Sequence, residues 1–203
     1  MPTKAAYHHG NLAEALVAAA RDVVIESGWE AVSLRAVART VGVSANATYR
    51  HFPDKAALLL AIATQAFDQL AARMRRVQAR SKGQDERAAI ARFEATGRAY
   101  FGFAVDNPEL FRLMFSPVGR GHADGREDGQ TPYDLLAEAL DGLVVAGVLL
   151  PEKREGAEML AWTSVHGLAT LSLSGVLETS RERKAALEQV LAFVVSGLSS
   201  RPL

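Results

Sequence analysis

The chain has 203 residues, of which 49% are hydrophobic and 23% charged, and its formal net charge is zero. This composition is typical of a soluble globular protein, and the absence of cysteine excludes disulfides, thiolate metal sites and a cysteine nucleophile. The longest nearly apolar run, Leu143 to Leu150, is shorter than the roughly 20 residues that span a bilayer, so we expect a cytoplasmic protein.

Helical periodicity predominates along the chain, and no convincing strand pattern is present. Caps, prolines and glycines divide it into helical segments at residues 11–28, 34–40, 44–51, 53–80, 85–105, 109–115, 131–146, 151–177 and 179–197. Residues 116–130 contain four glycines and many polar side chains, which predicts a loop. The sequence therefore predicts an all-α protein of about nine helices, whose first three form a compact head over residues 1–56.

The charges are unevenly distributed between the two parts of the chain. Residues 1–82 hold 11 Lys and Arg against 6 Asp and Glu, whereas residues 83–203 hold 12 against 17. A basic N-terminal part beside an acidic remainder indicates that the first part faces phosphates.

Residues 33–55, SLRAVARTVGVSANATYRHFPDK, have the spacing of a helix-turn-helix. Ala38 is the small residue that the second helix packs against, and Gly42 stands where the tight turn needs glycine. Val37, Val41 and Val43 line the inner face between the two helices. This arrangement places the second helix in the major groove of DNA while the first crosses the backbone.

This segment resembles the TetR/AcrR family of transcriptional regulators in Val43-Ser44, Tyr49, His51-Phe52 and Lys55. The stretch 7–12, YHHGNL, resembles one subgroup of that family, and 161–167, AWTSVHG, resembles the Trp…His-Gly signature of its C-terminal domain. The resemblance implies a helix-turn-helix DNA-binding domain at 1–56 and a C-terminal ligand-binding and dimerisation domain at 57–203. It also implies that a ligand shifts the fourth helix and changes the spacing of the two heads.

The candidate DNA contacts differ in the role that each residue type suits. Ser33 and Ser44 begin helices, where free backbone amides attract phosphate. Tyr49, His51 and Lys55 are similar to the phosphate-gripping positions of the family. The remaining candidates are Arg35 for phosphate, Arg50 for guanine or phosphate, and Asn46, Ala47 and Thr48 for bases. Many relatives carry an apolar residue at the position of Thr48, so this side chain faces either the core or the bases.

The second half of the chain is rich in aromatic residues that either line a ligand cavity or form solid core. Trp162 and His166 lie one helical turn apart, which fits both interpretations. The candidate ligand contacts are Phe93, Tyr100, Phe103, Phe111, Met114, Phe115, Trp162 and His166. The pair His8-His9 lacks acidic or cysteine partners nearby, which favours an arm near phosphate over a metal site. We expect neither a metal nor a cofactor.

The function that fits these features best is a repressor that binds a palindromic operator as a homodimer and is released by a small, apolar inducer. The last two helices are expected to form the dimer interface, through Gly167, Ala169, Ser172, Ser174, Leu187, Val190, Leu191, Val194 and Leu198. One alternative is a scaffolding or nucleoid protein that uses the same head and responds to a protein partner. An enzyme is the other, but no catalytic cluster stands at a convincing spacing, so we expect none.

Overall fold

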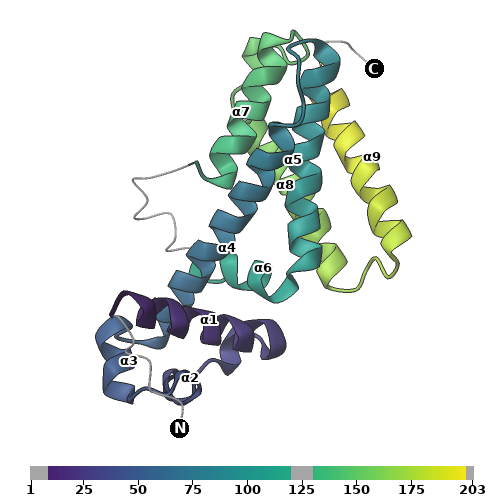
Figure 1. Cartoon of the computed structure of the whole chain (residues 1–203). Helices are drawn as coiled ribbons and strands as arrows, with labels where there is room; N and C mark the ends of the chain where they lie inside the picture. Colours follow the sequence, from purple (N-terminus) through teal and green to yellow (C-terminus); the bar gives the residue numbers. More distant parts are fainter. Residues whose placement is uncertain (1–8, 120–129, 200–203) are drawn as a thin grey trace. The chain divides into compact units, whose positions relative to one another are not determined.

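The computed structural model describes residues 9–119 and 130–199. Within these ranges the chain forms nine α-helices and no β-strand, which confirms the predicted all-α fold (Figure 1). The helices are α1 (His9–Ser27), α2 (Leu34–Val41), α3 (Ala45–His51), α4 (Lys55–Gln78), α5 (Glu86–Asp106), α6 (Pro108–Met114), α7 (Pro132–Val145), α8 (Ala157–Leu173) and α9 (Ser180–Leu198).

Most helix ends follow the local signals in the sequence. Thr131 begins α7 and Thr179 begins α9, each with a complete capping box. Two expectations were wrong. Helix α1 begins at His9, two residues before the start that the sequence predicts at 11. The segment 151–177 is not one helix, because Gly156 adopts a left-handed conformation with φ +75° and separates the 3-10 turn at Pro151–Lys153 from α8. The loop expected at 116–130 lies largely outside the described residues, as does His8.

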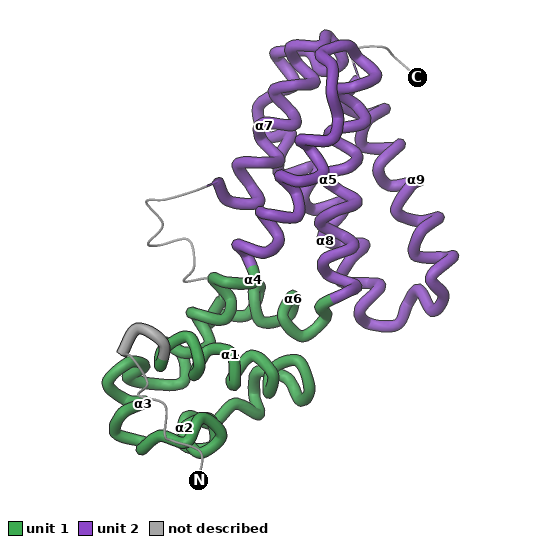
Figure 2. Tube along the Cα trace, in the orientation of Figure 1, with its two compact units in different colours: residues 1–66, 107–126 green, residues 67–106, 127–203 purple. Residues whose placement is uncertain are grey.

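The chain divides into two compact units, one formed by residues 1–66 and 107–126 and the other by 67–106 and 127–203 (Figure 2). The division between the two units passes through α4, between residues 66 and 67, and the functional domain boundary expected at 56 stays a prediction. Helix α6 belongs to the first unit, where it packs against α1. No local signal marks this, because helix-to-helix packing depends on residues about 80 positions apart.

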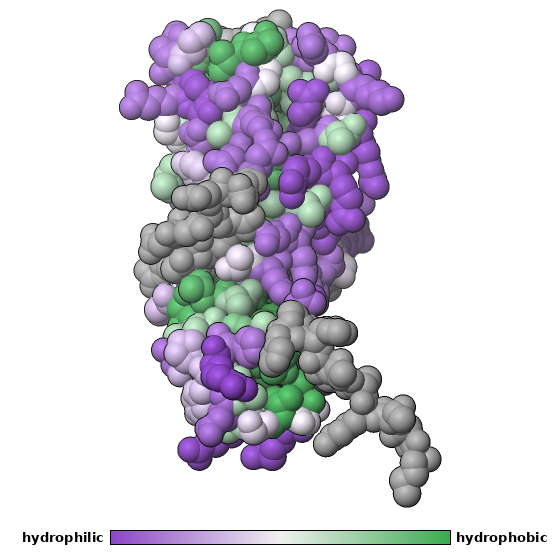
Figure 3. Space-filling model, turned by 60° about the vertical axis from the view of Figure 1, so that its left-hand side comes forward, coloured by the Kyte–Doolittle hydropathy of each residue, from purple (hydrophilic) through white to green (hydrophobic). Residues whose placement is uncertain are grey.

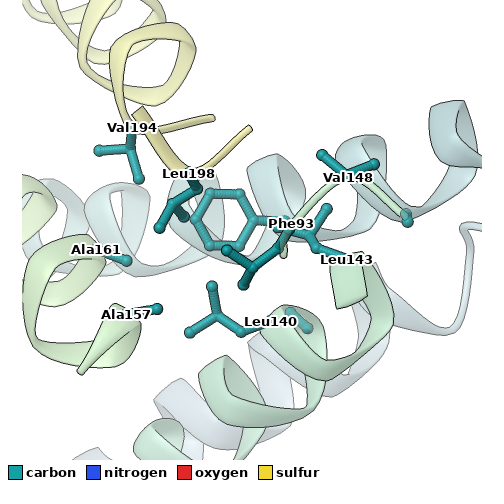
Figure 4. Packing of buried hydrophobic residues seen from close by; sticks show 11 residues of the cluster. Phe93, Leu140, Leu143, Val148, Ala157, Ala161, Val194 and Leu198 are labelled. Atoms are coloured by element: carbon teal, nitrogen blue, oxygen red, sulfur yellow. The ribbon is translucent and has the colours of Figure 1, made fainter. Parts of the chain in front are cut away.

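Helix α5 is the centre of the second unit, where it contacts α7, α8 and α9. Phe93 of α5 lies inside an apolar cluster (Figure 4), with Leu140, Leu143, Val148, Ala157, Ala161, Val194 and Leu198 around it. A guanidinium also ties α5 to α9, since Arg98 donates to both carboxylate oxygens of Glu188, at 2.9 and 2.6 Å. This contact lowers the pKa of Glu188.

Hydrophilic side chains cover most of the face shown in Figure 3, and the hydrophobic ones on it form separate patches. Among the described residues, no helix is both long enough and apolar enough to cross a membrane.

Candidate DNA-binding surface and ligand domain

The helix-turn-helix is built by hydrogen bonds that its own sequence provides. Gly42 ends α2 in the left-handed region at φ +79°, and the Val43 amide donates to the Ala38 carbonyl at 2.9 Å. The Ser44 hydroxyl then begins α3 by accepting from the Ala47 amide at 3.2 Å. Turn and cap together fix the direction in which α3 leaves α2.

One side of α3 is exposed and carries the side chains that suit DNA. Asn46, Tyr49 and Arg50 are exposed at helical spacing, and 42% of Tyr49 is accessible. Ala47 and His51 are partly buried, and Ser44 is exposed at the start of the helix. The predicted phosphate and base contacts on α3 therefore share one surface, with the exception of Thr48.

Thr48 points into the core of the head. Its side chain is fully buried, and its hydroxyl has no hydrogen-bond partner. Assigning it to the bases was wrong, because a residue with no accessible surface cannot contact DNA. The signal lay in the spacing: Thr48 stands one helical turn before Phe52, which is also buried.

Replacing Thr48 by valine should stabilise the protein. A buried hydroxyl without a partner costs about 1–3 kcal/mol, while valine has the same shape and a similar helix propensity. We expect the unfolding midpoint to rise by about 2–4 °C for each kcal/mol gained. Thr40→Val is the matched control, because Thr40 is exposed and its hydroxyl donates to the Ala36 carbonyl. Equal midpoints for wild type and Thr48→Val in thermal scans would contradict the assignment.

Lys55 and the arginines of α2 complete the candidate surface. The Lys55 ammonium donates to the carbonyl of Glu30 at 2.6 Å, which joins the start of α4 to the turn Trp29–Ala31. An ammonium has three donors, so this bond leaves capacity for a phosphate. Arg35 and Ser33 are exposed as predicted. Arg39 is exposed one turn after Arg35, and that spacing of four could have identified it as a further candidate.

The predicted ligand residues do not form one group. Phe111, Met114 and Phe115 belong to the unit that contains the head, where the rings of Phe111 and Phe115 lie 4.9 Å apart. Phe93 belongs to the second unit and fills its apolar core, and Phe103 is also buried there. The sequence placed all of them in one domain because it could not show that α6 packs with α1.

Tyr100, Trp162 and His166 come together as a hydrogen-bonded chain in the second unit. The indole N–H of Trp162 donates to the Tyr100 oxygen at 3.0 Å, and that oxygen lies 2.8 Å from Nδ1 of His166. Since indole only donates, the Tyr100 oxygen accepts from Trp162, whereas the direction of its hydrogen bond with Nδ1 depends on the tautomer of His166. The ring of Tyr133 contacts that of Trp162 edge to face, with 5.6 Å between the two ring centroids. These three hydrogen-bonded side chains provide polar groups within an otherwise aromatic environment.

Burial determines the protonation states of Tyr100 and His166. It raises the pKa of Tyr100 and lowers the pKa of His166, so both groups are neutral near pH 7. In the unfolded chain His166 titrates near 6.5, which means that the unfolded state binds a proton more readily. The stability contributed by neutral His166 is present above about pH 6.5 and is lost as the pH falls below that value.

We therefore expect the unfolding midpoint of the wild type to fall more steeply from pH 7.5 to pH 5.5 than that of His166→Asn. The asparagine amide can either accept from or donate to the Tyr100 hydroxyl in place of Nδ1, and it does not titrate. Thermal scans at both values measure the difference, and equal slopes would show that His166 is not responsible.

The outer face of α8 carries exposed apolar residues and no Asp, Glu, Lys or Arg. Met159, Leu160 and Leu171 are each about half exposed, and 76% of Phe193 on α9 is accessible. The hydroxyls on this face bond to their own helix: Thr163 to Met159, Ser164 to Leu160, Thr170 to His166 and Ser174 to Leu171. A methyl group on Gly167 would meet open space. The face is therefore apolar, with its polar donors satisfied.

Several residues expected at the dimer interface are instead buried within the protomer. Ala169, Ser172, Leu187, Leu191, Val194 and Leu198 have almost no accessible surface. Including them was wrong, because apolar residues occur on both faces of α8 and also outside the core on α9, and only the packing shows which of them face the protomer's own core. Gly167, Ser174 and Val190 remain at least partly accessible.

Two family models match the chain. The model described as "Bacterial regulatory proteins, tetR family" matches residues 16–62, and "Tetracyclin repressor-like, C-terminal domain" matches residues 93–194. The chain belongs to the TetR family of transcriptional regulators. The TetR head coincides with the helix-turn-helix described above. No group of three or more histidines and acidic residues that could hold a metal occurs in the described parts of this TetR protein.

Relatives agree with the TetR assignment. The transcriptional activator FasR of Mycolicibacterium smegmatis is 27% identical over 93% of this chain and 83% of its own length. The nucleoid occlusion factor SlmA of a Marinomonas species is 33% identical, but the match spans 46% of this chain and 45% of that protein. A solved structure of a Rhodococcus protein of unknown function has 28% identity, covers 97% of this chain and 100% of that one, and gives a TM-score of 0.79. NalD of Pseudomonas aeruginosa, with 18% identity over 95% and 99% of the two chains, shares the fold at a TM-score of 0.62.

Proposed function

We propose that this TetR-family chain is a repressor that binds a palindromic operator as a homodimer and is released by a small molecule bound in its C-terminal domain. The observation that carries the proposal is the exposed side of α3, where Asn46, Tyr49 and Arg50 stand together on a capped helix-turn-helix. We also propose that the protein acts in the cytoplasm, where bacterial operators lie.

Each exposed residue of this surface suits a particular DNA contact. The amide of Asn46 suits the edge of adenine, and the guanidinium of Arg50 suits guanine or phosphate. Tyr49, Arg35 and Lys55 suit phosphates, which position the head without reading sequence. With base contacts from α3 and phosphate contacts from the residues around it, one head can recognise one operator half-site.

The proposed dimer forms through the apolar outer face of α8 together with Phe193 of α9. An exposed helix face without charges is typical of an interface rather than of a solvated surface. Gly167 in its middle favours close approach of the partner's helix, which a larger side chain would prevent. A twofold dimer presents two recognition helices, which fit half-sites about 34–36 Å apart.

The proposed ligand site is centred on the hydrogen-bonded Tyr100–Trp162–His166 group, with Tyr133 as its aromatic neighbour, and Phe103, buried one helical turn after Tyr100, stays a candidate. A few polar groups among aromatic side chains are typical of small-molecule sites. Phe93 is withdrawn from this set because it fills the core, and Phe111, Met114 and Phe115 are withdrawn because they lie in the other unit. The protein leaves the operator if the ligand binds more tightly to the state in which the spacing of the two heads does not match the half-sites.

Selection of bound duplexes from a random-sequence DNA pool tests the proposal. We expect an inverted repeat whose half-site centres are one helical turn apart, or a multiple of that spacing. A thermal-shift screen of small apolar metabolites should then find a ligand that stabilises the protein and weakens binding to the selected duplex. Recovery of no enriched sequence would refute the repressor proposal.

The partial similarity to SlmA, a nucleoid occlusion factor, favours one further candidate, a DNA-bound scaffold that responds to a protein partner. The same screen separates the two functions. A scaffold would bind its selected DNA with an affinity that no small molecule in the screen changes.

A further inference from the structure

The end of α4 and the turn after it, residues 73–82 with the sequence RMRRVQARSK, carry five basic side chains and no acidic one. The whole run belongs to the second compact unit (Figure 2). The residues that follow it, 83–203, are acidic, with 12 Lys and Arg against 17 Asp and Glu. The positive charge is therefore concentrated in this run and does not reflect the composition of the unit.

Four of the five cations face solvent without an acidic partner. Arg73 is the exception, because it is paired with Asp106 at 2.7 Å. The other four, all exposed, form what we term the basic cluster: Arg75, Arg76, Arg80 and Lys82. None of the four forms an ion pair with any residue that the structure describes. Asp85, the next acidic residue along the chain, instead accepts from the Ala88 amide at 2.8 Å at the start of α5.

The helix end by itself accounts for only part of this cluster. Cations in the last turn of a helix are stabilised by its dipole, which gives Arg75 and Arg76 a structural role. That role does not extend to Lys82, which lies four residues after the last residue of α4. Like charges four residues apart, such as Arg76 and Arg80, repel each other. An anionic ligand would remove that repulsion.

The turn that carries Lys82 is held in one conformation by α5. The Nη2 nitrogen of Arg92 donates to the carbonyls of Ser81 at 3.1 Å and Gly83 at 2.9 Å, one on each side of Lys82. Gly83 has φ +113°, which a residue with a side chain rarely adopts. A turn that is already ordered loses little conformational entropy when it binds a ligand.

The chemistry of the basic cluster fits the phosphates of double-stranded DNA. Three of its four side chains are arginines, whose planar guanidinium can bind phosphate through two parallel hydrogen bonds. None of the large apolar side chains exposed on the described surface lies within residues 67–90. The cluster therefore offers no apolar anchor for a bilayer and no aromatic ring on which unpaired bases could stack.

We propose that the basic cluster is a second DNA contact, located in the C-terminal unit, which binds the phosphates of double-stranded DNA without reading sequence. None of its residues lies on α8 or α9, so the proposed dimer face does not include them. The contact requires no operator, and it adds sequence-independent affinity to that of the head.

The salt dependence of binding to a labelled random-sequence duplex tests the proposal. Each phosphate that a cation neutralises contributes about 0.9 to the slope of log K against log salt. In fluorescence anisotropy we expect Arg76→Gln/Arg80→Gln to decrease the magnitude of this slope by about 1.8 for each protomer on the duplex. Arg181→Gln/Lys184→Gln is the matched control, because it removes the same charge from exposed positions of α9 in the same unit, and its slope should not change.

The contribution of the head is separated by repeating the titrations in Tyr49→Ala/Lys55→Gln, where the head binds phosphate more weakly. We expect Arg76→Gln/Arg80→Gln to decrease the slope in this background as well. Circular dichroism checks the fold, which should persist because both arginines are exposed. Equal slopes in the cluster variant and the α9 control would overturn the proposal.

Two other polyanions, poly-glutamate and phosphatidylglycerol vesicles, are titrated in parallel. If Arg76→Gln/Arg80→Gln weakens binding to either of them and leaves the duplex slope unchanged, the cluster serves a protein or a membrane and the proposal is wrong. If the random pool yields no enriched sequence, only the repressor proposal fails, because the duplex in these titrations contains no operator.

Discussion

Phe193→Asp is expected to convert the proposed dimer into monomers. Burying a phenylalanine side chain contributes about 1.5–3 kcal/mol, and twofold symmetry places this residue in the interface twice. The dimer should therefore weaken by about 10²- to 10⁴-fold, before any cost of burying the new carboxylate. Sedimentation velocity across a dilution series measures the change, and circular dichroism checks that the protomer stays folded, since Phe193 is 76% exposed within it.

Val145→Asp is the matched control for this experiment. Val145 is 80% exposed at the end of α7, outside the α8 and α9 face, so the same charge there should leave the dimer intact. Operator affinity should fall with Phe193→Asp alone, because a monomer reads one half-site. A dimer of unchanged strength in Phe193→Asp would show that this face is not the interface.

Tyr49→Ala should nearly abolish operator binding while leaving the fold and the dimer unchanged. A hydrogen bond to a charged group contributes about 1.5–3 kcal/mol, and the dimer makes the contact at both half-sites. The expected loss is about 10²- to 10⁴-fold in affinity for the selected duplex, measured by fluorescence anisotropy. Tyr49→Phe should reproduce most of it, because that variant removes only the hydroxyl.

Lys55→Gln tests independently, through the salt dependence of DNA binding, whether the same surface contacts the operator. If each ammonium neutralises one phosphate, the slope of log K against log salt should decrease in magnitude by about 1.8 for the two protomers together. Ile25→Ala, half exposed on α1, should change neither the affinity nor the slope. Retained affinity in Tyr49→Ala together with an unchanged slope in Lys55→Gln would mean that DNA does not bind at this surface.

The sequence by itself determined the features that depend on neighbouring residues. Gly42 and Ser44 establish the turn and cap of the helix-turn-helix, and Thr131 and Thr179 begin their helices with capping boxes, because these hydrogen bonds span at most five residues. The all-α class and the exposed side of α3 followed from the same local periodicity.

Only the tertiary structure decided the features that depend on distant packing. Thr48 could face bases or core until Phe52 and the helices beneath it were placed, and α6 could join either unit until it was seen against α1. The outward faces of α8 and α9 emerged for the same reason: an apolar residue has the same signature in a core and in an interface, and only the packing of the protomer tells them apart.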